Sequence, residues 1–199
     1  MSDVVVPGSR DVRGTLDGDS DSETCVVACP PHPQHRGHRG DPRLKAVSDA
    51  LVERGIACLR FDYGEWDEGY GEREDARNAI RWAAGEFDSV GVFGYSFGGT
   101  MAILAAATVD ERVIGVSALA PAAQVGGGDL DVVGAVSELD CPLQVVYGTR
   151  DDTAEWELIV AAARERGASV EELSADHFFL GKHERIGGAV AAFLAELGG

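Results

Sequence analysis

One pentapeptide, Gly94-Tyr95-Ser96-Phe97-Gly98, constrains the fold more than any other part of the sequence. It follows an apolar run at positions 90–93 and precedes an alanine-rich stretch at positions 100–107, which predicts a strand, a sharp turn and a helix. A serine at the tip of such a turn has a strained backbone, so the residues two before and two after it must be small. Gly94 and Gly98 meet this condition. A close-packed glycine turn without any chemistry is the alternative that the pentapeptide alone leaves open.

The remaining sequence predicts one α/β domain over residues 1–199, because no segment resembles a linker between two cores. Apolar runs that fit buried strands occur at positions 4–6, 12–16, 25–28, 56–61, 90–93, 113–119, 143–147 and 169–173. Helical spacing of apolar residues is clearest at positions 44–51, 76–83, 156–163 and 186–197. We therefore expect a mostly parallel sheet of about seven or eight strands, flanked by helices.

A serine hydroxyl is a weak nucleophile, so a base has to lie within reach of Ser96. In turns of this kind the partners follow the serine along the chain, first an acid and then a histidine. His177 lies in a short loop before the final helix, whereas His183 lies at the start of that helix, where a solvated position is expected. His177 is therefore the predicted base, and a loop histidine without a role is the alternative.

The acid that orients the imidazole should follow the apolar run at positions 143–147, where Asp151 and Asp152 are adjacent. Asp152, with Glu155 three residues later, fits a capping box for a helix over residues 153–166. Asp151 is therefore the preferred acid, and Asp152 remains the alternative. Asp176, next to the base, is interpreted as a turn residue.

Two backbone amides should stabilise the negative charge that develops on a carbonyl oxygen under attack. The amide of Phe97 is the first, because it lies at the predicted helix start. The second should come from the loop at positions 29–38, whose prolines have no N–H. His32 and Gln34 are the candidates, and Gln34 is preferred as the first amide after the His-Pro pair.

The same loop also permits a different interpretation, because histidine and cysteine are residues that bind zinc. The possible ligands are Cys25, Cys29, His32, His35 and His38. The two cysteines lie in a strand that should be buried, and the prolines stiffen the loop, so we expect neither a metal nor another cofactor.

Several segments spread over nearly the whole chain carry a family resemblance. They are Pro31-His32-Pro33, Arg60-Phe61-Asp62-Tyr63-Gly64, Gly71-Glu72-Arg73-Glu74-Asp75-Ala76, Gly94-Tyr95-Ser96-Phe97-Gly98-Gly99, Asp151 and Asp176-His177-Phe178-Phe179. The chain resembles the α/β-hydrolase superfamily, and more narrowly its compact, lidless dienelactone-hydrolase-like members with a His-Pro-His-Pro-type oxyanion loop. The resemblance implies a single-domain α/β-hydrolase fold in which Ser96, Asp151 and His177 are nucleophile, acid and base.

The chain departs from this pattern at three points. Pro30 stands where such proteins usually have a first histidine, and Arg36-Gly37 stands where they have paired glycines. Ser96 replaces the cysteine of true dienelactone hydrolases. These differences argue against their substrate and for hydrolysis of generic carboxylic esters through an acyl-enzyme intermediate.

Residues 120–140, where larger relatives insert a helical lid, contain Gly126-Gly127-Gly128 and one weakly apolar stretch at positions 130–136. At most one short helix fits there, so we expect an open site and small soluble esters as substrates. The same triad would also serve an acyltransferase or a peptidase, and a non-catalytic binding protein could retain the fold.

The charge balance bears on the surroundings in which the protein works. Thirty-four acidic residues face 17 basic ones, giving a formal charge of −17, and only Lys45 and Lys182 are lysines. This excess disfavours nucleic acids and anionic membranes as partners. It is typical of proteins from salt-loving organisms, in which salt screens the self-repulsion, although an ordinary acidic soluble protein would also fit.

The N-terminus has neither a basic start nor a long apolar segment, so no signal peptide or membrane span is expected. The four cysteines fall in or beside predicted strands: Cys25, Cys29, Cys58 and Cys141. Buried free thiols of a cytoplasmic protein are the interpretation that fits them best.

Overall fold

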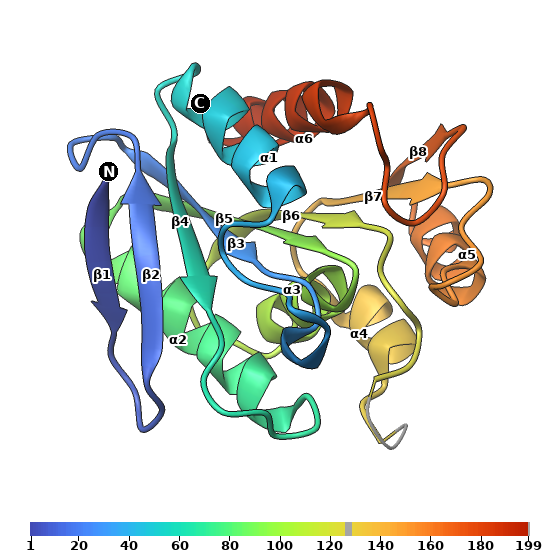
Figure 1. Ribbon diagram of the computed structural model, residues 1–199, viewed down its shortest axis with the longest axis horizontal. Coiled ribbons are helices and arrows are strands. Elements are labelled where there is room, and N and C mark those ends of the chain that lie inside the picture. Colours follow the sequence, from blue (N-terminus) through green and yellow to red (C-terminus); the bar gives the residue numbers. More distant parts are fainter. Residues whose placement is uncertain (126–128, 199) are drawn as a thin grey trace.

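Eight segments of the sequence form one sheet, in the order β1-β2-β4-β3-β5-β6-β7-β8 (Figure 1). The computed structural model describes residues 1–125 and 129–198. The strands are β1 (Ser2–Val6), β2 (Val12–Asp17), β3 (Thr24–Cys29), β4 (Ala57–Asp62), β5 (Ser89–Tyr95), β6 (Val113–Leu119), β7 (Leu143–Gly148) and β8 (Ser169–Leu173). Each predicted strand is present, with ends that differ from the expected ones by at most two residues.

The sheet is mostly parallel, as predicted. β1 and β2 form an antiparallel hairpin, and β2 pairs antiparallel with β4. From β4 to β8 every neighbouring pair is parallel. All residues of β3, β6 and β7 are buried, because helices cover both faces of the sheet there.

The helices lie on the two faces of the sheet (Figure 1). They are α1 (Pro42–Val52), α2 (Tyr70–Glu86), α3 (Phe97–Ala106), α4 (Val132–Glu138), α5 (Glu157–Glu165) and α6 (His183–Leu197), with a short 3-10 helix, η1 (Pro33–His35). In Figure 1, α1 and α6 lie together on one face, and α2 to α5 lie on the other. This arrangement confirms the predicted single-domain α/β fold.

Two hydrophobic cores result, one on each face. The core under α1 and α6 includes Leu44, Val47, Phe93, Ile186 and Val190, which are fully buried. The core on the other face joins α2, α3, α4 and α5 to the sheet and includes Ile80, Met101, Val136, Val145 and Ile159. Burying an aliphatic or aromatic side chain of this size stabilises the folded state by roughly 1.5–3 kcal/mol. The two cores therefore hold the strands in place, and the site is built at the ends of these strands.

The connection between β6 and β7 contains no large lid among its described residues. Its regular structure there is the single short helix α4, in agreement with the expectation of at most one helix. Residues 126–128, the glycine triplet on which that expectation partly rested, lie outside the described residues. In the part of the chain that the structure describes, no helix is both long and apolar enough to cross a bilayer.

Candidate active site

Ser96 occupies a sharp turn between β5 and α3. Its φ of 56° and ψ of −122° lie in a region that non-glycine residues rarely adopt, and its amide donates to the carbonyl of Leu119 at 2.7 Å. A Cβ atom at Gly94 would overlap the carbonyl of Gly98, and one at Gly98 would overlap the carbonyls of Cys29 and Pro30. The two glycines of the pentapeptide are therefore required by close packing of backbone on backbone.

His177 lies in the loop between β8 and α6, and its ring reaches the candidate nucleophile. Its Nε2 is 2.9 Å from Oγ of Ser96, a hydrogen-bonding distance at which the imidazole could accept the hydroxyl proton. The histidine is only 6% exposed. The other histidine considered for this place, His183, begins α6 as its first residue.

Asp151 follows β7 and completes a chain of three side chains. Its Oδ2 lies 2.7 Å from Nδ1 of His177, and its side chain has no exposed surface. Its Oδ1 accepts hydrogen bonds from the amides of Thr153 and Ala154, at 2.9 and 3.1 Å. One carboxylate therefore orients the imidazole with one oxygen and closes the turn after β7 with the other.

Asp152 does not have the place that its sequence pattern suggested. It is exposed, and the helix expected over residues 153–166 begins only at Glu157, with no side-chain cap at Trp156. The predicted capping box is therefore wrong, because Asp151 already takes the amides of the turn that precedes α5.

The structure supports one of the two amides expected to bind an oxyanion. Phe97 is the first residue of α3 and lines a cavity next to Ser96, and amides in the first turn of a helix have no intrahelical acceptor. The amide of Gln34, by contrast, donates to Nδ1 of His32 at 3.3 Å, and Gln34 lines neither cavity beside Ser96. The preference for Gln34 is thus not supported, because its N–H is directed at the histidine ring within its own loop. His32, the other candidate, lines both cavities.

Aromatic side chains pack around His32. Its ring centroid lies 4.7 Å from that of His35, 4.5 Å from Trp66 and 4.8 Å from Phe97. Burial lowers the pKa of His32, and the neighbouring His35 lowers it further. A neutral ring is what the hydrogen bond from Gln34 requires, since the Nδ1 of a protonated imidazole cannot accept. Trp66 was not identified from the sequence, because it lies 34 positions after His32 and belongs to no motif.

The loop that carries Trp66 is held by a buried acid. Asp75, on α2, accepts a hydrogen bond from the amide of Gly64 at 2.9 Å and another from Nε of Arg10 at 2.8 Å. Burial raises the pKa of Asp75, although the two hydrogen bonds oppose that change. Glu72 accepts the amides of Asp67 and Gly69 from the same loop, at 2.9 and 2.8 Å. Arg10, between β1 and β2, thus helps to hold the loop whose Trp66 packs against His32, through a bond to Asp75 that spans 65 positions of sequence.

Two cavities meet at Ser96. One, of about 370 Å³, is also lined by Tyr95, Arg43, Asp41 and Phe178. The other, of about 260 Å³, is also lined by Phe97, Ala122, Gln124 and Ala154. Both include Ser96, His177, His32, His35 and Thr153, so a molecule bound across them would lie against the hydroxyl.

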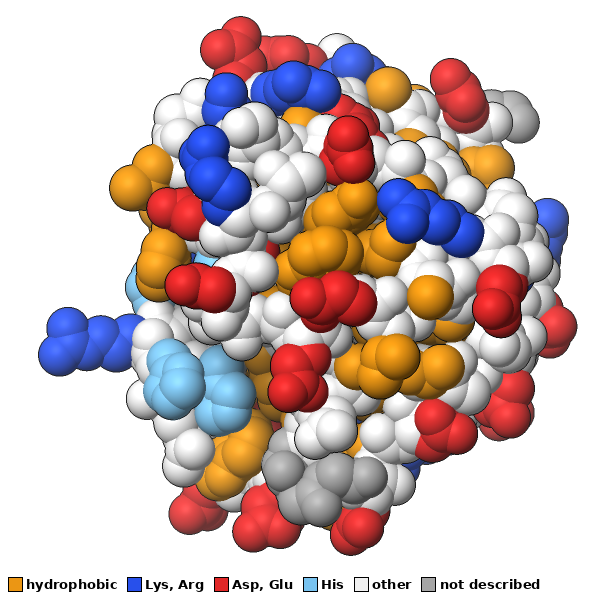
Figure 2. Space-filling view, turned by 90° about the vertical axis from the view of Figure 1, so that its right-hand side faces the viewer, with side chains coloured by type: hydrophobic (Ala, Val, Ile, Leu, Met, Phe, Trp, Pro, Cys, Tyr) orange, Lys and Arg blue, Asp and Glu red, His pale blue; other side chains and the backbone are white. Residues whose placement is uncertain are grey.

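A surface view from the side of β8 and α5 shows how charge is distributed (Figure 2). Asp and Glu side chains are scattered over this face between hydrophobic side chains, and histidine side chains gather near one edge. The acidic excess of the sequence is therefore spread out on this face and not concentrated in one patch.

The zinc interpretation of the oxyanion loop finds no support in the described residues. No group of three or more His, Cys, Asp or Glu side chains among them is arranged to hold a metal ion. Cys25 and Cys29 are fully buried in the core, and burial raises the pKa of both thiols, which opposes the thiolate form that binds zinc. The four cysteines are free and buried, as expected.

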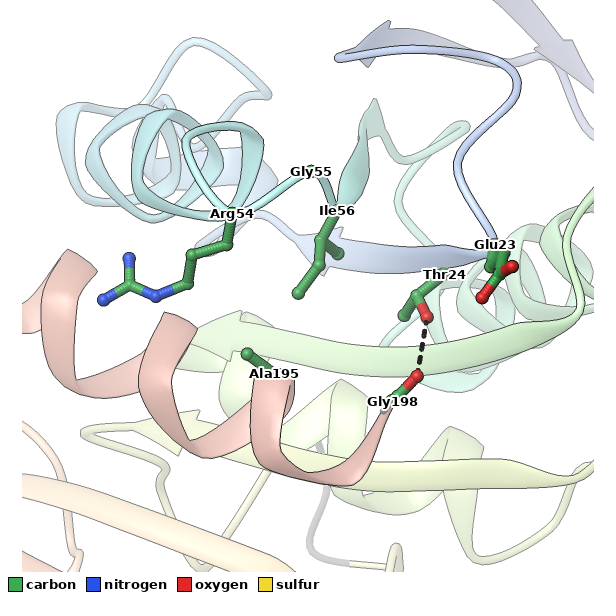
Figure 3. Close-up of a pocket in the computed structure, with 7 residues that line it drawn as sticks. All are labelled: Glu23, Thr24, Arg54, Gly55, Ile56, Ala195 and Gly198. Atoms are coloured by element: carbon green, nitrogen blue, oxygen red, sulfur yellow. Dashed lines mark hydrogen bonds between the residues drawn. The ribbon is translucent and has the colours of Figure 1, made fainter.

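A further cavity, of about 330 Å³, lies beside the C-terminal ends of α1 and α6 (Figure 3). Thr24 at the start of β3, Ile56 before β4 and Gly198 after α6 line it. Its two charged side chains, Glu23 and Arg54, lie on opposite sides of the cavity in Figure 3. No nucleophile and base face each other among the residues that line it, so this cavity offers no alternative catalytic site.

The comparison with known families gives one match. The model of the X-Pro dipeptidyl-peptidase (S15) family matches residues 34–141, more than half of the chain. The matched region contains Ser96 and Phe97 but neither Asp151 nor His177. No curated protein matches the sequence significantly.

Solved structures share the fold over nearly the whole chain. Est1E from Butyrivibrio proteoclasticus has a TM-score of 0.85 and 18% identity, covering 99% of both chains. An α/β serine hydrolase without a lid from Xanthomonas campestris has a TM-score of 0.82 and 21% identity, covering 98% of this chain and 94% of its own. A dienelactone hydrolase from Anabaena variabilis has a TM-score of 0.74 and 22% identity, covering 98% of this chain and 95% of its own. The predicted α/β-hydrolase fold is confirmed, and the chain belongs to the X-Pro dipeptidyl-peptidase (S15) family of α/β hydrolases.

Proposed function

We propose that this hydrolase cleaves small carboxylic esters, with Ser96 as the nucleophile, His177 as the general base and Asp151 as the acid that orients it. The observation that carries the proposal is the continuous chain of contacts from Oγ of Ser96 to Nε2 of His177 and from Nδ1 to Asp151, at 2.9 and 2.7 Å. This constellation is recognised by geometry and is independent of the order of the residues in the sequence.

The reaction proceeds by two acyl transfers. His177 accepts the hydroxyl proton as Ser96 attacks the ester carbonyl, and the imidazolium then protonates the departing alcohol. The carboxylate of Asp151 stabilises the imidazolium through Nδ1. Water, activated by the same imidazole, attacks the acyl-enzyme and releases the carboxylic acid together with free Ser96.

Backbone amides receive the charge on the tetrahedral intermediate. The amide of Phe97 at the start of α3 is one donor, and we assign the amide of His32 as the second, because His32 lines both cavities beside Ser96. Each such donor contributes about 3–4 kcal/mol to lowering the barrier. The rings of Trp66 and Phe97 pack against His32 and limit the movement of this loop.

The dimensions of the cleft favour small substrates. Its two cavities are about 370 and 260 Å³, and the described part of the β6–β7 connection adds only the short helix α4 above the sheet. A soluble ester of modest size fits this space, whereas a long acyl chain needs an extended apolar tunnel. Est1E from Butyrivibrio has been solved with ferulic acid bound, so a protein of this fold accommodates a carboxylic acid.

Peptide hydrolysis is the second candidate, because the family model is that of X-Pro dipeptidyl-peptidases. An enzyme that removes N-terminal dipeptides has to recognise the free α-ammonium group, for which a carboxylate is the natural partner. In the described lining of the cleft the carboxylate of Asp41 is paired with Arg43. Asp151 is engaged with His177 and the turn after β7. Both carboxylates already have partners, so neither is available to bind an ammonium group. This favours an ester over a peptide as the substrate.

The central test is the replacement of the nucleophile. Ser96→Ala should abolish both the hydrolysis of p-nitrophenyl acetate and the labelling by a fluorophosphonate probe, measured by intact mass. Ser137→Ala, at an exposed position of α4, is the matched control and should retain both. Retained esterase activity in the Ser96 variant would refute the proposal.

A substrate comparison separates the two candidate activities. The wild-type protein should hydrolyse p-nitrophenyl acetate and butyrate, and it should leave Gly-Pro-p-nitroanilide intact. Faster turnover of the anilide than of either ester would favour the peptidase. Transfer of the acyl group to an added alcohol in preference to water would instead identify an acyltransferase.

A further inference from the structure

The residue before the nucleophile contacts the backbone of the base. Tyr95, the last residue of β5, donates a hydrogen bond from its hydroxyl group to the carbonyl oxygen of His177 at 2.9 Å. Both residues are buried, and their ring centroids lie 5.5 Å apart. The element that presents the hydroxyl of Ser96 is therefore bonded directly to the loop that presents the imidazole.

A second side chain reaches the next carbonyl of that loop. Arg43, in the first turn of α1, lies with its guanidinium 4.4 Å above the centre of the Tyr95 ring. Its Nη1 donates to the carbonyl of Phe178 at 3.3 Å. Its Nη2 forms an ion pair with Asp41, whose other oxygen caps α1 through the amide of Arg43 at 2.8 Å. Arg43 is thus anchored at its own helix end and bridges the tyrosine ring and the histidine loop.

The loop needs such restraint, because its backbone includes an unfavourable conformation. Phe179 has a φ of 52°, in the left-handed region that a bulky residue avoids, and its side chain is completely buried. A conformation of this kind costs of order 1–3 kcal/mol and persists only where the surrounding structure holds it. His177 and Phe178, whose carbonyls accept the hydrogen bonds from Tyr95 and Arg43, are the two residues directly before Phe179.

We propose that Tyr95 and Arg43 are positioning residues that hold the His177 loop, and with it the imidazole, at bonding distance from Ser96. The inference rests on the proposed function, in which His177 is the base. Neither side chain takes part in a proton transfer. They act on the backbone that carries the imidazole.

The hydroxyl of Tyr95 is suited to a permanent donor role. Burial raises the pKa of Tyr95 to about 12, so the phenol keeps its proton throughout the pH range in which the protein would work. The ring of Tyr95 stacks against the guanidinium of Arg43, and its hydroxyl donates to the carbonyl of His177. Substitution by phenylalanine removes the hydrogen bond and leaves the stacking.

Two measurements test the proposal with Tyr95→Phe. For p-nitrophenyl acetate, kcat should fall about tenfold while KM stays within twofold, because a misplaced base slows the chemical step without weakening substrate binding. Hydrogen exchange followed by mass spectrometry should show faster exchange across residues 174–182. Tyr70→Phe, an exposed tyrosine at the start of α2, is the matched control and should change neither quantity.

Arg43→Lys tests the second half of the bridge. Lysine keeps the charge but loses the planar fork that both stacks on a ring and donates to a carbonyl, so kcat should again fall with KM preserved. Because both residues hold one loop, the double variant should lose less activity than the product of the single losses. Arg54→Lys, which changes an exposed arginine bonded to Ala50, is the control.

The exchange measurement keeps this inference separate from the proposed function. If the wild-type protein hydrolyses no ester, the proposed function fails, and exchange in residues 174–182 still shows whether Tyr95 and Arg43 hold the loop. Unchanged exchange in Tyr95→Phe overturns the inference, and so does a kcat within twofold of wild type in an active enzyme. The inference would also be overturned if Tyr70→Phe lost as much kcat and as much thermal stability as Tyr95→Phe.

Discussion

Asp151 and His177 meet through Oδ2 and Nδ1 at 2.7 Å although 26 positions separate them in the sequence. Asp151 follows β7 and His177 follows β8, and these strands are parallel neighbours. Carboxyl ends of adjacent parallel strands open at the same edge of a sheet, where Ser96 also lies after β5. The topology thus brings the three side chains to one edge.

Replacing the acid should separate its two duties. In Asp151→Asn, the side-chain oxygen can still accept hydrogen bonds from the amides of Thr153 and Ala154. The NH2 group then points at Nδ1 of His177. Because NH2 is a donor, it favours the imidazole tautomer in which Nδ1 has no proton, which is the wrong one for a base at Nε2. We expect kcat to fall about 10³–10⁴-fold with little change in Tm. Kinetics on p-nitrophenyl acetate and thermal denaturation measure the two quantities.

The adjacent aspartate provides the control for this experiment. Asp152→Asn changes an exposed side chain and should leave kcat and Tm close to wild type. Asp151→Ala, which removes both oxygens, should also destabilise the fold by about 1 kcal/mol through loss of the turn. A larger kinetic loss in Asp152→Asn than in Asp151→Asn would reassign the acid.

The oxyanion loop can be displaced without touching the three central side chains. A Cβ atom at Gly37 would overlap the carbonyls of Pro31 and His32, so Gly37→Ala should shift the amide of His32. Loss of one oxyanion donor costs about 10²–10³ in kcat. Gly188→Ala, in α6 with open space around the new methyl group, is the matched control. Wild-type turnover in Gly37→Ala would exclude His32 as the second donor.

The pair of Asp17 and Arg60 should make stability depend on pH. Burial alone would raise the pKa of Asp17, but hydrogen bonds from Arg60 at 2.5 Å and Ser48 at 2.7 Å outweigh it, and the pKa falls below its ordinary value of 3.8. Because the folded pKa is the lower one, the pair stabilises the fold fully above pH 3.8 and loses this contribution as the pH falls through the folded value.

The corresponding experiment compares urea unfolding of wild type and Asp17→Asn. At pH 7 the variant should be less stable by about 2 kcal/mol, because a charge-assisted hydrogen bond to a buried guanidinium is lost. The difference should shrink below pH 3.8 as the wild-type carboxyl takes up its proton. Asp3→Asn, on the exposed side of β1, should show no such difference, and a constant gap for Asp17→Asn at every pH would contradict the assignment.

Stability should rise with salt, because the formal charge is −17 and the carboxylates on the face in Figure 2 are spread out and not concentrated in one patch. The screening length falls from about 10 Å at 0.1 M to about 3 Å at 1 M, which weakens repulsion between them. Thermal denaturation in KCl from 0.1 to 2 M should therefore show a steep increase in Tm. A flat response would remove the inference of adaptation to high salt.

Local patterns were enough to predict the strands and the turn at Ser96. His177 and Asp151 were chosen from their order along the chain after Ser96, and their side chains lie within hydrogen-bonding distance of each other. Buried strands of a parallel sheet are continuous apolar runs, and the turn at Ser96 demands small residues at two fixed positions. These features depend on neighbours in the sequence, so they can be recognised without knowing the fold.

The features that the sequence did not predict depend on contacts between distant segments. The capping box assigned to Asp152 was wrong because Oδ1 of Asp151 accepts the hydrogen bonds from the amides of Thr153 and Ala154 in that turn. Gln34 was preferred as the first amide after the His-Pro pair, but its amide donates to Nδ1 of His32 in the loop that forms η1. The contacts of Tyr95 with the His177 loop and of Arg10 with Asp75 join residues 82 and 65 positions apart and leave no local pattern.

Because Gly98 has no Cβ, the start of α3 can pack directly against the backbone carbonyls of Cys29 and Pro30 at the end of β3. The position of the Phe97 amide relative to the loop after β3 is therefore set by main-chain contact. Rim positions such as Phe178, Gln124 and Thr153 can be randomised to change selectivity while this scaffold stays constant. Laboratory evolution of new preferences should begin there.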